Sequence, residues 1–577
     1  MRALDWAVLV AAMAGITLYG LWKGRRTRGL EDFLVADRRM RWHHVALSIM
    51  ATQASAITFL STPGQAFTDG MRFVQFYLGL PVAMVVLSVT AVPAFRRLKV
   101  YTAYEYLEGR FDLKTRTLAA GLFLIQRGLS TGVSVYAPSL ILSVIMGWDI
   151  RVVIFIIGGT ITLYTALGGA RAVDNTNFLQ FLIIMGGMFI AFFTLVSLLP
   201  ADVSFIEATH VAGRLGRLNA IDFSFDATNQ YNFWSGLIGG CFLALSYFGT
   251  DQSQVQRLLT GESVTQSRLG LLFNGLVKVP MQFFILFLGA LVFAFYQFTQ
   301  PPVFFNPVEL ERARAGPRAD ELRAIEGEYA AAFDAKLAEA RALVGALRAG
   351  DEGAEQEASE RLRAADERAK QVRGRAVAVL KDQNPKPEDT NYVFLNFVTH
   401  YMPAGVVGLV LAAVFFASMS SNASALSALA SSTVVDVQRR LTRPREDERY
   451  YFLSSKLVTV FWGLFAVAFA QYAGQLGSLV EAVNRLGSLF YGTILGIFLL
   501  AFYFKRVGGT AAFVGALAGE LVVLYCFYRT PLAFLWYNVV GAVTVVLVAL
   551  AVNPFTGKPN KFAENNSPKL NASGGKN

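Results

Sequence analysis

Long apolar stretches dominate the hydrophobic and polar pattern of this chain. Windows of about 20 apolar residues, the length that an α-helix needs to cross a bilayer, recur along most of the sequence. The first window lacks a small-residue cleavage site, which indicates a retained helix rather than a signal peptide. The pattern predicts an all-α polytopic membrane protein with about thirteen spanning helices. They are expected at 4–22, 43–70, 73–95, 117–146, 150–168, 176–199, 232–256, 269–297, 399–437, 452–473, 476–503, 508–528 and 531–552.

One segment interrupts this pattern. Residues 309–389 are rich in Ala, Glu and Arg and carry two apolar stripes at helical spacing. The stripes predict two helices that pack on each other as an antiparallel hairpin. An arm of roughly 30 residues would project about 45 Å. It is either a solvated insertion without a role in transport or a docking arm for a partner protein or a second copy of the chain.

These patterns divide the chain into four parts. Residues 1–299 and 392–552 hold the membrane helices, and residues 300–391 hold the charged helical hairpin. Residues 553–577 form a tail rich in Asn, Lys, Gly and Pro, a composition that predicts disorder.

The charge of the chain fits a membrane protein rather than a nucleic-acid binder. The formal net charge is +11, but the basic residues gather in alternate short loops. Such loops lie in the cytoplasm. The amino terminus and the hairpin are then expected outside a cell membrane, and the carboxyl tail inside. The loops hold Lys23, Arg25, Arg26, Arg28, Arg38, Arg39, Arg41, then Arg96, Arg97, Lys99, then Arg439, Arg440, Arg443, Arg445.

The chain shows no sign of enzymatic or structural metal chemistry. Cys241 and Cys526 lie in separate spans, and four histidines form no ligand cluster. Asp251 and Glu481 are expected to be isolated near helix ends, so no facing carboxylates or nucleophile with a base are visible. We therefore expect a protein that is not an enzyme.

A serine-rich apolar helix is the most informative stretch. Residues 408–436 place many hydroxyls at membrane depth, where lipid cannot satisfy them. Small and hydroxyl residues also serve as packing contacts between membrane helices, which accounts for several of them. The adjacent pair Ser420 and Ser421 points instead to a cavity or an ion.

Five separated motifs resemble the sodium:solute symporter family. They are GLEDFLVADRRM, YTAYEYLEGRF, TALGGARAVDNTNFLQ, YFGTDQSQVQR and the serine-rich helix, and they stand in the family's order. The stretch LFLIQRGLSTGVSVYAPSLILS is most similar to the branch of monocarboxylate, multivitamin and iodide carriers. The resemblance implies a leucine-transporter-type (LeuT) fold: two inverted repeats of five helices, with one helix before and two after. Ions and solutes bind at the midplane of such folds, where helices are broken.

The resemblance also implies a sodium site. Two carbonyls of the first core helix and a carbonyl with two hydroxyls of the eighth fall on Ala51, Ala54, Ala417, Ser420 and Ser421. A second sodium site of some members uses an aspartate where this chain has Asn177, together with Ser424, while Ala423 replaces another hydroxyl. The second site is therefore in doubt.

Candidate solute contacts come from two sources. Arg127 and Lys278 lie inside spans, where cations are costly and mark functional sites by default, although Arg127 alternatively snorkels or pairs with a helix end. The resemblance adds a lysine contact at Lys278 and an aromatic inner gate at Tyr247 and Phe248. Thr58 and Tyr77 occupy positions where the family's sugar carriers use glutamine and glutamate, so a sugar would need different hydrogen bonds.

The sequence thus predicts a carrier that couples inward sodium flow to the uptake of a small polar solute by alternating access. Alternatives are a sodium-independent facilitator or channel on the same fold, or a solute sensor. One sodium moving down ~100 mV gains about 2.3 kcal/mol, and this voltage term vanishes if one sodium moves with one monoanion. A single sodium site therefore favours neutral or zwitterionic solutes unless the anion is abundant outside.

Overall fold

Helices make up the regular structure of the chain, which a computed structural model describes over residues 1–24, 40–53, 55–98, 100–382, 384–442 and 447–556. Side chains are described in these ranges except at 17, 20–24, 98 and 168–178. The described residues contain no strand, only an isolated bridge between Met40 and Gly261. Ten of their helices are long and apolar enough to cross a membrane, and two shorter apolar helices accompany them. The predicted class, an all-α polytopic membrane protein, is confirmed.

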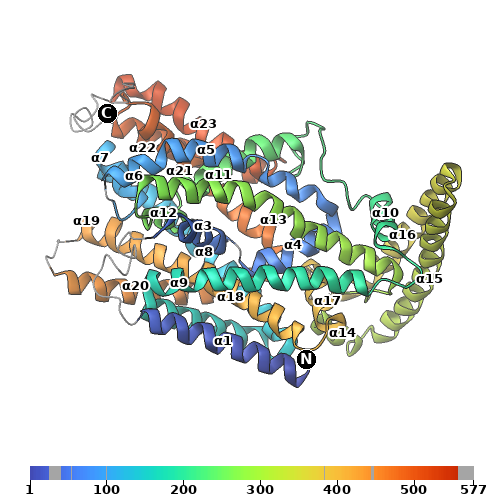
Figure 1. Cartoon of the computed structure of the whole chain (residues 1–577). Coiled ribbons are helices and arrows are strands. Elements are labelled where there is room, and N and C mark those ends of the chain that lie inside the picture. The colour runs from blue at the N-terminus through green and yellow to red at the C-terminus, as the bar shows by residue number, and fades with distance from the viewer. Residues whose placement is uncertain (25–39, 54, 99, 383, 443–446, 557–577) are drawn as a thin grey trace, which may run out of the picture.

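The long helices lie side by side and run between the two ends of the molecule (Figure 1). The predicted windows fall on them, but the second, third, seventh and ninth windows are each divided between consecutive helices, and the fifth and sixth join in one. In chain order the bundle consists of α1 (Ala3–Gly24), α3 (Trp42–Gln53), α4 (Ala56–Asp69), η2 (Gly70–Tyr77), α5 (Leu80–Val89), α6 (Ala91–Leu98), α8 (Leu113–Met146), α9 (Ile150–Ser197), η3 (Ser235–Gly239), α11 (Gly240–Gly249), α13 (Val264–Phe298), α18 (Val406–Ser432), α20 (Glu448–Ala473), α21 (Leu479–Tyr503), α22 (Gly509–Arg529) and α23 (Phe534–Val552).

Shorter helices connect or cover the bundle. At the end that holds the carboxyl end of α23 are α7 (Ala103–Arg110), α12 (Gln252–Leu259) and α19 (Arg439–Leu441). Hydrogen bonds tie this end together: Arg110 donates to the carbonyl of Phe504 over 2.7 Å, and the Gly508 amide donates to Asn553 over 3.0 Å. At the opposite end are α10 (Phe205–Arg214), α14 (Pro307–Arg314), α15 (Ala319–Ala349), α16 (Glu352–Leu380) and α17 (Val393–Tyr401).

The division between α3 and α4 is the local feature that shapes the centre of the bundle. Ser55 is extended (φ −82°, ψ 168°) and occupies the N-cap position of α4, where its side chain makes no capping hydrogen bond. Thr52, Ser55 and Thr58 have lower helix propensity than Ala, and Pro63 inside α4 lacks an amide donor. Gly289 of α13 lets the second half approach closely, because a Cβ there would lie 2.2 Å from the Pro63 carbonyl oxygen. The resemblance implies broken helices at the midplane, and α3 and α4 form such a broken helix.

The serine-rich helix α18 occupies the middle of the bundle. Of its most apolar window, 83% is buried inside the protein, the largest share of any membrane helix in the described residues. It packs against α1, α8 and α9 and passes the break between α3 and α4. The hydroxyls of α18 are thus turned toward other helices rather than toward lipid, as the cost of unsatisfied polar groups in a bilayer requires.

The hairpin formed by α15 and α16 lies across the end of the bundle instead of projecting from it (Figure 1). A buried apolar cluster joins it to α10 and to the end of α13. The cluster contains Leu343 and Leu362 from the hairpin, Val211 from α10, and Phe293 and Phe298 from α13. The expectation of an arm about 45 Å long that stands free in solvent is therefore wrong, because one face of the hairpin is covered by the bundle.

Charged side chains reinforce this contact at its rim. Glu207 accepts from Arg348 over 2.7 Å, and Glu355 accepts from Arg214 and, over 2.9 Å, from His210. Deeper in the hairpin, Lys336 and Asp366 form a pair at 3.6 Å with side chains less than a tenth exposed. Rim pairs of this kind contribute little each, but they set the position of α10 against both helices of the hairpin.

Acidification is expected to loosen the hairpin from α10. Hydrogen bonds from Arg348 and the Ser204 amide lower the pKa of Glu207 to about 2, and His210 and Arg214 lower the pKa of Glu355. Because a glutamate in an unfolded chain titrates near 4.3, these contacts stabilise the docked hairpin fully above about pH 5 and are lost as the pH falls through the folded pKa.

Amide exchange of α15 and α16, corrected for intrinsic rates, measures this effect. Protection should fall as the pH is lowered from about 6 toward 3, and the double variant E207Q/E355Q should show the lower protection already at pH 6. Glu326→Gln, which removes a pair between Arg314 and Glu326 within the same charged segment, is the matched control. Equal protection in wild type and E207Q/E355Q would contradict the expected role of the rim pairs.

Candidate functional site

The break between α3 and α4 faces the hydroxyls of α18. The Ser424 hydroxyl lies 3.4 Å from that of Thr52 on α3, and the Ser421 hydroxyl lies 3.5 Å from that of Ser134 on α8. Ala51, Ala417 and Ser420 are buried beside them. Residue 54 lies outside the described residues, so the structure places four of the five predicted sodium ligands on these facing helices and says nothing of Ala54.

This environment contains hydroxyl and carbonyl oxygens and no His, Cys, Asp or Glu cluster in the described part of the chain. Hard cations take oxygen ligands, and a set without carboxylates holds them weakly. The donor chemistry therefore fits a sodium ion that binds and leaves in each transport cycle. The coordination by the predicted residues stays a prediction.

The predicted second sodium site is only partly described. Ser424 is buried and lies by Thr52, and Ala423, also buried, offers no side-chain oxygen. Asn177 belongs to α9, but its side chain lies outside the described residues. The second site therefore stays in doubt.

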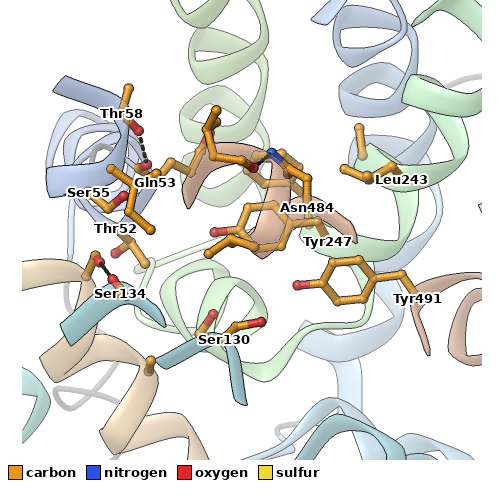
Figure 2. A pocket seen from close by; sticks show the side chains of 18 of the residues that line it. Thr52, Gln53, Ser55, Thr58, Ser130, Ser134, Leu243, Tyr247, Asn484 and Tyr491 are labelled. Carbon is orange, nitrogen blue, oxygen red and sulfur yellow. Dashed lines mark hydrogen bonds between the residues drawn. The ribbon is translucent and has the colours of Figure 1, made fainter. Parts of the chain in front are cut away.

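A cavity of about 160 Å³ opens next to the break. Every predicted solute contact lines it: Arg127, Thr58, Tyr77, Tyr247 and Lys278, together with Phe248 of the predicted gate and Ser421. Figure 2 shows Thr52, Ser55 and Thr58 on one side, Leu243 and Tyr491 on the other, and the ring of Tyr247 between them. Residues from distant parts of the sequence thus meet at one place, while their roles stay predictions.

Several polar lining residues were not predicted. They are Gln53, Ser55, Gln126, Ser130, Thr131, Ser134, Asn422, Asn484 and Tyr491. The only signal in the sequence is that each is polar within an apolar span, and packing residues share that signal. Gln53 shows how such residues are paired. Its side-chain amide donates to the side-chain oxygen of Asn274 over 3.0 Å, and its backbone carbonyl accepts from the Thr58 hydroxyl over 3.3 Å.

Lys278 is one of the two charged side chains in the described wall of this cavity. Its residue is 3% exposed, and its Nζ lies 5.9 Å from the centre of the Tyr77 ring. Within the described residues no carboxylate pairs with it and no hydrogen bond to it is formed. A buried ammonium without a counterion is unfavourable, and a ring face offsets only part of that cost.

Arg127, in contrast, already has a counterion. It forms an ion pair with Asp251 and donates to the Tyr491 hydroxyl over 3.0 Å, and that hydroxyl donates to Asp251 over 2.9 Å. The expectation that Asp251 is isolated near a helix end is wrong, because α8, α12 and α21 bring the three side chains together. The guanidinium also lies 5.5 Å from the centre of the Tyr247 ring.

Hydrogen bonds join several segments of the bundle at the end near the hairpin. Glu481 at the start of α21 accepts from Gln65 of α4 over 3.2 Å and from Tyr231 over 3.0 Å. Ser478 donates to the other side of the Gln65 amide over 3.0 Å. Glu481, like Asp251, was expected to be isolated, and it instead joins three segments above the cavity. At the other end, Tyr247 accepts from Gln254 of α12 over 2.8 Å.

The sequence was compared with known families and proteins. Residues 33–321 and 375–519 match the family model described as the Sodium:solute symporter family, so the unmatched interval lies within α15 and α16. A sodium/sialic acid symporter of Proteus mirabilis is 24% identical over 96% of this chain and 95% of its own length. A sodium-dependent multivitamin transporter of Oryctolagus cuniculus is 26% identical over 97% of this chain and 73% of its own length. The human sodium/iodide cotransporter is 32% identical over 52% of this chain and 46% of its own.

A solved structure supports the architecture. The structure of a Na⁺-coupled sialic acid symporter in a substrate-bound, outward-open state superposes with a TM-score of 0.75, covering 97% of this chain and 99% of that one at 23% identity. The fold is therefore of the leucine-transporter type, as expected.

Removal of the paired hydroxyls on α18 is expected to abolish sodium dependence. The double variant S420A/S421A deletes two of the predicted oxygen ligands without changing helix propensity much. Solute uptake into proteoliposomes, measured with and without an inward sodium gradient, should lose its gradient dependence. Ser431→Ala, farther along the same helix and also buried, is the control and should keep it. Sodium-driven uptake that survives in S420A/S421A would rule out the site.

Proposed function

Because the chain belongs to the sodium:solute symporter family and couples inward sodium flow to the uptake of a small polar solute, we propose that this solute is a small monoanion held by Lys278. The carrying observation is the unpaired ammonium of Lys278 in the wall of the cavity. Among the described residues, Arg127 and Lys278 are the charged ones that line the cavity, and no carboxylate lines it. Asp251 offsets Arg127, which leaves one positive charge for the solute to balance.

The magnitude of this charge effect supports an anion over a neutral solute. Two unit charges 4 Å apart attract by about 4 kcal/mol at an effective dielectric constant of 20. A carboxylate or halide near Lys278 gains part of that energy, while a neutral solute leaves the ammonium unpaired at the cost of its burial. Serine, threonine, glutamine and asparagine side chains in the wall supply hydrogen bonds for the rest of the solute.

The names of relatives agree with this proposal. Iodide, monocarboxylates and sialic acid, named for the human, Xenopus laevis and Proteus mirabilis proteins, are anions at neutral pH. The proposal revises the expectation from coupling energetics. One sodium with one monoanion moves no net charge, so a tenfold sodium gradient concentrates the anion about tenfold, which suits an anion already abundant outside the cell.

In the proposed cycle, sodium binds between α3 and α18 at Ala51, Ala54, Ala417, Ser420 and Ser421. The anion binds beside Lys278, Tyr77 and Thr58, and the ring of Tyr247 with Phe248 blocks its inward path. The broken helix α3–α4 then moves relative to α18 and opens the opposite end of the cavity. Sodium drives the cycle only through a higher affinity for one of the two arrangements.

We place the amino terminus, α10 and the hairpin outside the cell membrane. The observation behind this placement is that described basic residues of short loops, Arg96, Arg97, Arg439 and Arg440, belong to α6 and α19 at the end opposite the hairpin (Figure 1). The face of the hairpin that remains for a protein partner is its charged outer one, which carries exposed pairs such as Arg375 with Glu328.

Uptake by purified protein tests the proposal. Proteoliposomes with an inward sodium gradient are offered iodide, lactate, nicotinate, pantothenate and sialic acid, with glucose and alanine as uncharged or zwitterionic comparisons. At least one anion should enter faster with sodium than without it. Sodium-driven uptake of only glucose or alanine would overturn the monoanion.

Substitutions at Lys278 test its role in the same assay. Lys278→Gln should reduce uptake of the preferred anion at subsaturating concentration by about tenfold or more, equivalent to about 1.4 kcal/mol. Lys278→Arg keeps the charge and should retain more uptake than the glutamine variant. Equal losses in both variants would mean that the lysine is needed for its shape rather than its charge.

A further inference from the structure

Asp251 lies behind the cavity wall rather than in it. Arg127, Tyr247, Ser253 and Tyr491 line the cavity, whereas Asp251 does not and its side chain is fully buried. Arg127 reaches the cavity with its side chain 11% exposed. A solute in the cavity therefore meets the guanidinium and never touches the carboxylate that neutralises it.

The bonds of Asp251 divide between its two oxygens. Oδ1 caps α12, accepting from the Ser253 amide over 2.9 Å and from the Ser253 hydroxyl over 2.6 Å. Oδ2 accepts from Arg127 and, over 2.9 Å, from the Tyr491 hydroxyl. One oxygen thus serves the helix and the other holds the guanidinium, so the two roles are separable by substitution.

The Arg127 guanidinium keeps further N–H donors in this ion pair. Its Nη2 carries the bonds to Asp251 and Tyr491, and its Nε is buried without a partner. A guanidinium has five N–H donors, so Arg127 retains donor capacity while its charge is offset. Asp251 therefore offsets the charge that Arg127 brings to the cavity and leaves N–H donors of Arg127 available for hydrogen bonds.

We propose that Asp251 sets the charge selectivity of the transporter: by neutralising Arg127 from behind the wall, it restricts the cavity to solutes with one negative charge and excludes dianions. This inference rests on the proposed role of Lys278 as the anchor for that single charge. Asp251 is a positioning residue, because it acts on the solute only through Arg127. Tyr491 bridges the pair, because its hydroxyl accepts from Arg127 over 3.0 Å and donates to Asp251 over 2.9 Å.

Asp251→Asn is the variant that separates the roles. Asparagine is as good a helix N-cap as aspartate, so Oδ1 can still accept from Ser253. Its amide nitrogen takes the place of Oδ2 and meets the Arg127 donors with donors of its own. The guanidinium is then released toward the cavity with its charge uncompensated.

The readout is the ratio of dianion to monoanion uptake. The preferred monoanion of the wild type is compared with butyrate, succinate and butyramide, a set of one chain length and different charge, in proteoliposomes with an inward sodium gradient. D251N should raise the ratio of succinate to butyrate uptake by about tenfold or more. The double variant R127Q/D251N removes both charges and should return the ratio to the wild-type value.

A matched control removes a carboxylate from another buried pair. Asp366→Asn breaks the pair with Lys336 in the hairpin, far along the chain from the cavity wall, and should leave the ratio unchanged. An unchanged ratio in D251N, with the protein folded and still stabilised by sodium, would overturn the proposal. A raised ratio in D366N would show that the effect is unspecific and would overturn it as well.

If D251N takes up no solute at all, the double variant R127Q/D251N still tests the proposal. Recovery of uptake in R127Q/D251N would then show that the released charge is what blocks the cavity, in support of the proposal. If the double variant is as inactive as the single one, Asp251 serves only as the cap of α12 and the proposal fails. A different result would contradict the monoanion proposal itself. The wild type would then take up butyramide faster than butyrate, and Lys278→Gln would leave the order of uptake rates among these solutes unchanged.

Discussion

Every polar group at membrane depth in this protein has to find its partner within the protein, because lipid tails offer none. The arrangement of the centre follows from that constraint. The hydroxyls of α18 turn toward α3 and α8, as the contacts of Ser424 with Thr52 and of Ser421 with Ser134 show. Asp251 forms an ion pair with Arg127, whereas the ammonium of Lys278 lines the cavity without a counterion among the described residues. The ammonium of Lys278 therefore lies where water, an ion or a solute can reach it, and the cavity that holds it is the candidate functional site.

The same constraint joins the ion region to the solute region. Thr52 and Ser421 line the cavity and also belong to the facing surfaces of α3 and α18. A shift of α18 against the broken helix therefore changes both regions at once, with no intervening structure. Coupling between two ligands is reciprocal, and adjacency of this kind is its simplest physical basis. Close backbone approaches such as Gly289 to Pro63 pack the second half of the broken helix tightly against α13.

Much of this site could be predicted from local sequence, and the reason is physical. Lys278, Ser420 and Ser421 stand out because a polar side chain in an apolar span is costly, and Tyr247 lies in a recognisable motif. The partner of Arg127 could not be predicted in this way, since Asp251 follows it by 124 residues and only the three-dimensional fold brings the two side chains together. The docking of the hairpin on the bundle could not be predicted from the sequence for a similar reason. Its apolar stripes predict two paired helices, but nothing in them shows that Leu343 and Leu362 also cover Val211 of α10.

The charge of the cavity also bears on why sodium and solute travel together. A sodium ion at the proposed site beside Ser421 adds a second positive charge to a cavity that already holds the ammonium of Lys278. Like charges repel more strongly as the dielectric constant of their surroundings falls. A monoanion between them removes the repulsion and gains attraction from both. With the proposed solute, each ligand thus raises the affinity for the other, and the cavity favours the empty or the doubly loaded state over either half-loaded one. Tight coupling then follows from the positions of Lys278 and the α18 hydroxyls themselves, without a separate device to prevent the slippage of either ligand alone.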